Sequence, residues 1–98
     1  MNTEQDAYRK EMEAKLEKVK ADIRRLEAEV KEKNAQAQKG SQEQLQQLCE
    51  RREQFKAKLE GLKTASGAAW QEAREGVAAA WRDLESAVRR AGTEFKRR

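Results

Sequence analysis

The sequence of 98 residues contains no histidine, no proline and a single cysteine, Cys49. The absence of histidine removes the most common general base and metal ligand, and one thiol is too few for a structural zinc site. A single cysteine also excludes a framework of disulfides within the chain. No glycine-rich phosphate loop follows an expected strand, because the sequence indicates no strands. We therefore predict a protein that is not an enzyme, with no metal site and no cofactor.

Long apolar runs are also missing from the sequence. No segment approaches the length of a membrane span, and no hydrophobic signal segment follows Met1. A cytoplasmic protein of bacterial type is the simplest prediction, and contact with a membrane surface stays open. Charged residues make up 41% of the chain and apolar residues 37%, a mixture typical of long helices and coiled coils. The length predicts one helical domain over residues 1–98.

The first predicted helix runs from about residue 4 to residue 38. Its apolar residues recur at steps of three and four, the heptad spacing of a coiled coil. A turn is predicted at residues 39–41, because Gly40 suits the left-handed position after a helix and Ser41 with Gln44 forms a capping box for the next one. The apolar stripe consists of Tyr8, Met12, Leu16, Val19, Ile23, Leu26, Val30 and Ala37.

A second helix is predicted over about residues 42–65 and a third over about residues 68–96, with a weak break at Ser66 and Gly67. Arg52 occupies a stripe position of the second helix. It either extends its charge to the edge of the stripe or lies buried and fixes the register of the helices. The second stripe is Leu45, Leu48, Phe55, Leu59 and Leu62, and the third is Trp70, Ala73, Val77, Trp81, Leu84, Val88, Ala91 and Phe95.

Two all-α architectures follow from these three stripes. The favoured one is a long antiparallel helical hairpin, or coiled coil, that self-associates and carries the third segment at its C-terminal end. In that arrangement the first helix is too short to cover the end of the third stripe, from Trp81 to Phe95, which then needs a partner. In the alternative, the chain turns back at Ser66 and Gly67 to form a monomeric three-helix bundle.

The third stripe is the predicted interaction face, made of Trp70, Val77, Trp81, Leu84, Val88 and Phe95. Its leading predicted function is non-enzymatic: a coiled-coil interaction or scaffold protein that binds a second copy or a partner helix. The alternative is binding of a lipid or membrane surface by the same amphipathic face. Nucleic-acid binding by the basic tail Lys96-Arg97-Arg98 is less favoured, because such tails are commonly solvated helix ends.

Cys49 flanks the second stripe beside Arg51 and Arg52. The simpler interpretation is a small side chain that fills the edge of the helix contact. The alternative is a redox-sensitive thiol that crosslinks two chains, since nearby cations favour the thiolate.

Six segments of the chain form a distinctive set, and the spacing of the two Ala-Trp pairs is its most specific element. The segments are Gln5-Asp6-Ala7-Tyr8, Gln42-Glu43-Gln44-Leu45, Ala57-Lys58-Leu59-Glu60-Gly61-Leu62-Lys63, Ser66-Gly67-Ala68-Ala69-Trp70-Gln71-Glu72, Gly76-Val77 and Ala80-Trp81. In these segments the chain resembles a family of small bacterial coiled-coil proteins associated with stress response, some of which carry an apolipoprotein-like description. The resemblance spans nearly the whole chain and implies a helical, stress-associated protein without a known active site or cofactor.

Overall fold

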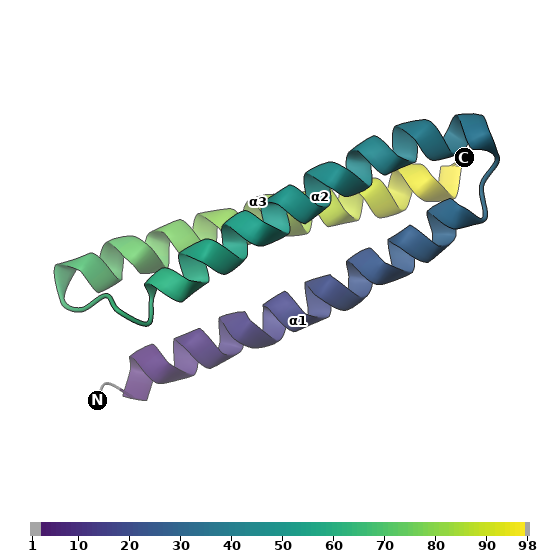
Figure 1. Cartoon of the computed structure of the whole chain (residues 1–98). Coiled ribbons are helices and arrows are strands. Elements are labelled where there is room, and N and C mark those ends of the chain that lie inside the picture. The colour runs from purple at the N-terminus through teal and green to yellow at the C-terminus, as the bar shows by residue number, and fades with distance from the viewer. Residues whose placement is uncertain (1–2, 98) are drawn as a thin grey trace.

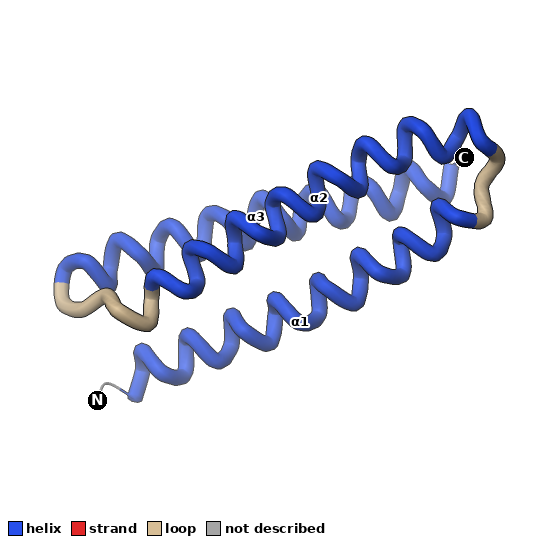
Figure 2. Tube along the Cα trace, viewed as in Figure 1, coloured by secondary structure: helices blue, strands red, loops and turns tan. Residues whose placement is uncertain are grey.

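The computed structural model describes residues 3–97 and contains three long helices and, within those residues, no strand (Figure 1). α1 spans Thr3–Lys31, α2 spans Ala35–Gly61 and α3 spans Ala68–Arg97. The helices lie along one axis in a bundle of 52 × 17 × 17 Å. Figure 2 shows the two loops at opposite ends of the bundle, so that α1 and α3 run parallel and α2 runs against both. The all-α prediction is confirmed.

The first turn lies earlier in the chain than the sequence suggested. The prediction of a turn at residues 39–41 is wrong, because Gly40 and Ser41 lie inside α2 and the chain turns at residues 32–34. The Asn34 side chain accepts a hydrogen bond from the Ala37 N–H at 3.0 Å and so caps α2. The Gln38 side chain donates to the carbonyl of Lys33 at 2.7 Å, which satisfies an acceptor just past the end of α1.

The lengths of the helices explain why this earlier turn is favoured. The three helices contain 29, 27 and 30 residues, so each is about 40–45 Å long at 1.5 Å per residue. Matched lengths allow every stripe to be covered from end to end. A turn at residue 40 would lengthen the first helix and shorten the second, and the ends of the stripes would be left exposed.

The second break lies where the glycine signal placed it. Residues 62–67 connect α2 to α3, and Gly67 has a φ of +59°, a backbone conformation that residues with a Cβ rarely adopt. The Gly67 carbonyl accepts hydrogen bonds from the N–H groups of Trp70 and Gln71 and opens α3. The chain therefore folds back here, as in the alternative three-helix bundle, and the favoured arrangement with an uncovered third stripe is wrong.

The three stripes meet in one continuous core. From α1 the core takes six heptad residues, from α2 and the following loop five, and from α3 six. Apolar burial of this kind provides most of the free energy that stabilises a small helical bundle. The buried apolar side chains are Met12, Leu16, Val19, Ile23, Leu26, Val30, Leu45, Leu48, Phe55, Leu59, Leu62, Trp70, Val77, Leu84, Ala87, Ala91 and Phe95.

Candidate functional site: the groove between α1 and α3

The predicted interaction face is largely used inside the chain. Four of its six side chains are buried in the core, with exposed fractions of 6% or less. Trp81 and Val88 are half-buried and pack against the edge of the core. The face therefore joins α3 to α1 and α2, and only its edge is open to solvent. The buried members are Trp70, Val77, Leu84 and Phe95.

The side of α3 that faces α2 is built from small residues. An added Cβ on Gly76 would lie 3.9 Å from the Lys58 side chain of α2. Ala87 and Ala91 lie against Leu48 and its α2 neighbours, around a small cavity of about 140 Å³. Small side chains let two helices approach closely, and α2 and α3 are the most intimately packed pair of the bundle.

Polar side chains also link α2 to α3 across this contact. Arg51 forms an ion pair with Asp83 at 3.1 Å, and the Gln44 side-chain amide donates to the Glu94 carboxylate. The Arg51 and Asp83 side chains are both partly exposed, so this pair contributes little to stability. Its effect is to fix the register of two helices whose small residues alone would allow sliding.

The side of α3 that faces α1 is built from aromatic residues. Tyr8 of α1 meets Trp70 edge to face, with ring centroids 5.9 Å apart and an angle of 73° between the planes. Trp81 lies about three turns further along α3, and the centroid of its ring is 5.6 Å from that of Phe55 in α2. These large side chains hold α1 and α3 further apart than small residues would, and this helix pair has the least extensive contact.

Cations lie over these aromatic rings. The Arg74 guanidinium lies 5.1 Å from the centroid of the Tyr8 ring and 5.9 Å from that of Trp70. The Lys15 ammonium lies 5.2 Å from the centroid of Trp81. Cation–π contacts at partly exposed sites contribute about 0.5–1 kcal/mol each. They place two cations, Arg74 and Lys15, and three aromatic rings at the contact between α1 and α3.

The groove between α1 and α3 is open to solvent along its length. It consists of two adjoining hollows of about 410 Å³ and 360 Å³ that share Tyr8, Gln71 and Arg74. From Trp70 to Trp81 it covers eleven residues, or about 17 Å of helix. We call this hollow the α1–α3 groove; it is lined by Glu4, Gln5, Ala7, Tyr8, Glu11, Met12, Lys15, Trp70, Gln71, Arg74, Glu75, Ala78, Trp81 and Arg82.

Folding changes the acidity of the Tyr8 hydroxyl in this groove. Partial burial raises the pKa of the Tyr8 hydroxyl above its ordinary value of 10.0, and the Glu11 carboxylate acts in the same direction. The positive charge of Arg74 acts against this rise. The hydroxyl also donates a long hydrogen bond, 3.5 Å, to the Arg74 carbonyl. At neutral pH the groove therefore contains a protonated phenol, which presents an apolar ring with a polar edge.

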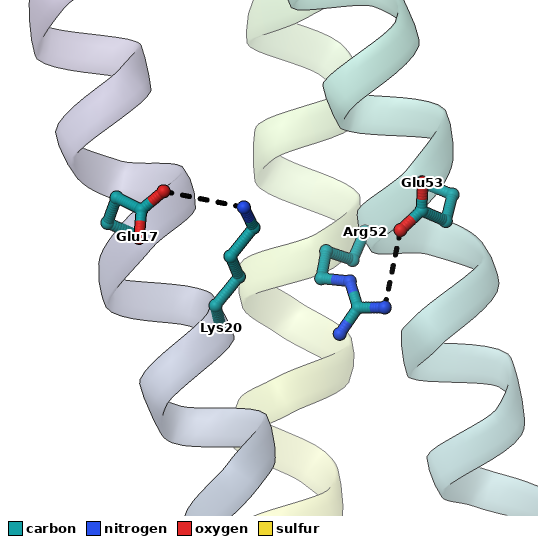
Figure 3. A network of polar contacts seen from close by, with 4 residues as sticks. All are labelled: Glu17, Lys20, Arg52 and Glu53. Atoms are coloured by element: carbon teal, nitrogen blue, oxygen red, sulfur yellow. Dashed lines mark hydrogen bonds and ion pairs between the residues drawn. The ribbon is translucent and has the colours of Figure 1, made fainter.

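The contact between α1 and α2 is a third, more polar boundary. Figure 3 shows Lys20 of α1 and Arg52 of α2 extending into the space between these helices. Each cation pairs with a glutamate of its own helix: Lys20 with Glu17 at 3.4 Å, and Arg52 with Glu53 at 3.3 Å. The Arg52 side chain is 24% exposed and its terminal nitrogen reaches Glu53. This is the arrangement in which a long side chain covers apolar surface and carries its charge to the edge.

The other predicted residues lie outside the groove. Cys49 is a half-buried free thiol at the edge of the core, which fits the role of a small filler. Its predicted crosslinking to a second chain stays a prediction. Lys96 is exposed at the end of α3, whereas Arg98 and the side chain of Arg97 lie outside the described part of the chain.

Within residues 3–97, no group of three or more His, Cys, Asp or Glu side chains is arranged to hold a metal ion. No helix in the same range combines the length and the apolarity needed to cross a bilayer. Comparisons of the chain with protein-family models, with curated proteins and with solved structures gave no significant match.

Sequence reasoning missed the cationic side of the groove. Lys15, Arg74 and Arg82 lie beside the apolar stripes rather than in them, so heptad counting assigns them to solvent. Their spacing from apolar residues could have identified them, because Lys15 follows Met12 by three residues and Arg74 follows Trp70 by four. At these spacings a long side chain covers its apolar neighbour on the same helix face.

Proposed function

We propose that the protein is a non-enzymatic interaction protein that binds a partner helix in the α1–α3 groove. The observation that supports this is a pair of half-buried aromatic side chains, Tyr8 and Trp81, along an open groove between two parallel helices. Aromatic residues in partly desolvated positions are the usual anchors of protein interfaces. An amphipathic helix recognises such a groove with residues at i, i+4, i+7 and i+11, and about 17 Å accommodates that set.

The shape of the groove favours a helix over a small molecule. Small-molecule sites are concave and enclose most of the ligand surface. The α1–α3 groove is instead open to solvent and follows the two helices for about three turns. A helix in this position would complete a four-helix bundle, with the two parallel helices α1 and α3 on either side of it.

Lipid binding by the α3 face is the weaker proposal for this fold. Its apolar side chains, including Val77 and Leu84, are fully buried against α1 and α2. They meet a lipid surface only if the bundle opens, which would lose the packing of the whole core. The roles in self-association and stress response stay predictions, as does the cytoplasmic location.

A helical probe tests the proposed function. The probe is a synthetic amphipathic peptide of about four helical turns, with leucines at i, i+4, i+7 and i+11 and glutamines on its flanks. Its binding to the full chain is measured by fluorescence anisotropy of a label on the peptide. Ala78 lines the groove, so Ala78→Phe should fill it and weaken binding about ten-fold or more.

The matched control is Ala79→Phe, which makes the same change at the next, exposed residue of α3. The control should bind the peptide as the natural chain does. Absence of peptide binding, or equal binding by both variants, would contradict the proposed function.

A further inference from the structure

We infer that the helix bound in the α1–α3 groove is acidic, with carboxylates that meet Lys15, Arg74 and Arg82. This inference rests on the proposed function and identifies the chemistry of the partner. It follows from the distribution of charge along the groove, which is not uniform. In the section between Met12 and Arg82, three cations line the groove with one carboxylate, that of Glu75.

The two arginines of this section lack an acidic partner among the described residues. Within residues 3–97, neither Arg74 nor Arg82 forms an ion pair with a carboxylate. The Arg74 guanidinium instead lies near the Tyr8 and Trp70 rings, and it also donates toward the Tyr8 hydroxyl. A guanidinium has five N–H donors, so these contacts leave donors for a carboxylate. The ring contacts therefore hold the cation in place for an anionic ligand.

Lys15 supplies the third cation, from the opposite rim. Its ammonium lies over the Trp81 ring and 3.8 Å from the Glu11 carboxylate. Glu11 is largely exposed, so this pair is weak and screened by solvent. An ammonium has three donors, and the Glu11 contact leaves others free for a carboxylate above Trp81.

The spacing of the arginines fits a helix better than an irregular anion. Arg74 and Arg82 are eight residues apart on α3, which places them about 12 Å apart along its axis. Carboxylates at i and i+7 or i+8 of a helix lying along the groove have the same separation. The other end of the groove is different, because Glu4 and Glu11 line it together with Arg74. The partner should therefore carry its acidic residues toward the Arg82 end.

Three peptides of the design described above test this inference, with flanks of glutamate, glutamine or lysine and the same leucines. The glutamate peptide should bind the full chain about ten-fold more tightly than the glutamine peptide, and the lysine peptide should bind most weakly. Added salt should reduce these differences, because the charges are exposed. Arg82→Glu should lower the affinity for the glutamate peptide and raise that for the lysine peptide.

The matched control is Arg90→Glu, which makes the same charge change on α3 beside the α2 contact, outside the groove. It should leave the order of the three affinities unchanged. Equal binding of the three peptides would overturn the acidic partner and leave the proposed function standing. Binding of none would overturn both.

Two other occupants are separate outcomes. In the first, vesicles containing phosphatidylglycerol displace the glutamate peptide, and Arg82→Glu abolishes this displacement. This result would overturn the helical partner in favour of an anionic lipid. A molar mass that doubles with concentration, and that Arg82→Glu returns to one chain, would overturn it in favour of a second copy. A single-chain mass and no displacement by vesicles support the acidic helix.

Discussion

The two sides of α3 pack against their neighbouring helices with different kinds of side chain. Toward α2, small residues on one helix face bring the backbones together, and polar pairs such as Arg51–Asp83 fix the register. Toward α1, the aromatic rings of Tyr8, Trp70 and Trp81 occupy the contact and keep the helices apart. One helix thus has a closed side and an open side. The small residues at i, i+3 and i+4 spacing on the closed side are Ala73, Gly76, Ala80, Ala87 and Ala91.

This difference separates stability from the proposed binding. The closed side packs Ala87 and Ala91 of α3 against α2 within the chain. The open side keeps aromatic and cationic surface that the chain does not cover. Three substitutions and one titration test the distinction, from the largest expected effect to the smallest.

Phe55→Ala should have the largest effect. Phe55 is 0% exposed and its ring supports Trp81, so it contributes both to the core and to the floor of the open side. Removing a buried phenylalanine ring leaves a cavity and costs about 3–5 kcal/mol of unfolding free energy. Urea unfolding followed by circular dichroism measures the loss. A loss of unfolding free energy below about 1 kcal/mol would contradict the role of Phe55 in the core and beneath Trp81.

Ala91→Leu tests the closed side. Ala91 is 2% exposed, so the added atoms of a leucine must either displace the neighbouring α2 side chains or enter the polar hollow lined by Gln44 and Arg51. Overpacking of this kind costs about 1–3 kcal/mol. The same substitution at the exposed Ala79 is the control and should stay within about 0.5 kcal/mol of the natural chain. If both variants unfold at the same urea concentration, α2 and α3 are not closely packed.

Gly76→Ala tests how closely α2 and α3 approach. The new methyl group meets only the Lys58 side chain, at 3.9 Å, which is an ordinary contact distance. Replacing a helical glycine whose site has room for a methyl group should therefore stabilise the fold by about 0.4–1 kcal/mol. A rise in thermal midpoint checks this. A fall would mean that the new methyl group meets α2 more closely than the 3.9 Å to the Lys58 side chain.

The titration of Tyr8 should show the smallest effect on stability, and it concerns only the open side of α3. Folding raises the Tyr8 pKa, so the folded state holds the phenolic proton more tightly than the unfolded state. The resulting contribution to stability is complete below the unfolded pKa of about 10 and is lost as pH rises through the folded pKa. Tyr8 is the only tyrosine, so tyrosinate absorbance follows it directly. Its titration should move to lower pH in concentrated urea; an identical curve in both conditions would contradict its burial.

The apolar stripes were predictable because a heptad pattern has a simple geometric cause. Leucine, isoleucine and valine at steps of three and four must share one helix face, and every member from Met12 to Val30 is buried. The break at Gly67 was predictable for a similar reason, since a positive φ favours glycine.

The first turn was mispredicted because two capping signals competed. Gly40 and Ser41 form a good local stop and start, but Asn34 is an equally good N-cap seven residues before Ser41. Local capping energies of about 1 kcal/mol do not decide between them. The register of three matched helices does decide, and Ser41 is fully buried as a result. The α1–α3 groove was also beyond reach of the sequence, because it depends on which helix faces which.

The parallel course of α1 and α3 has an electrostatic consequence. Each helix carries a partial positive charge at its first turn and a partial negative charge at its last, and two parallel neighbours place like ends together. α2 runs antiparallel to both helices, so at each end of the bundle its partial charge offsets that of one of them. A fourth helix running against α1 and α3 would complete the alternation of the macrodipoles. The bundle therefore favours one direction for an incoming helix before any side chain makes contact.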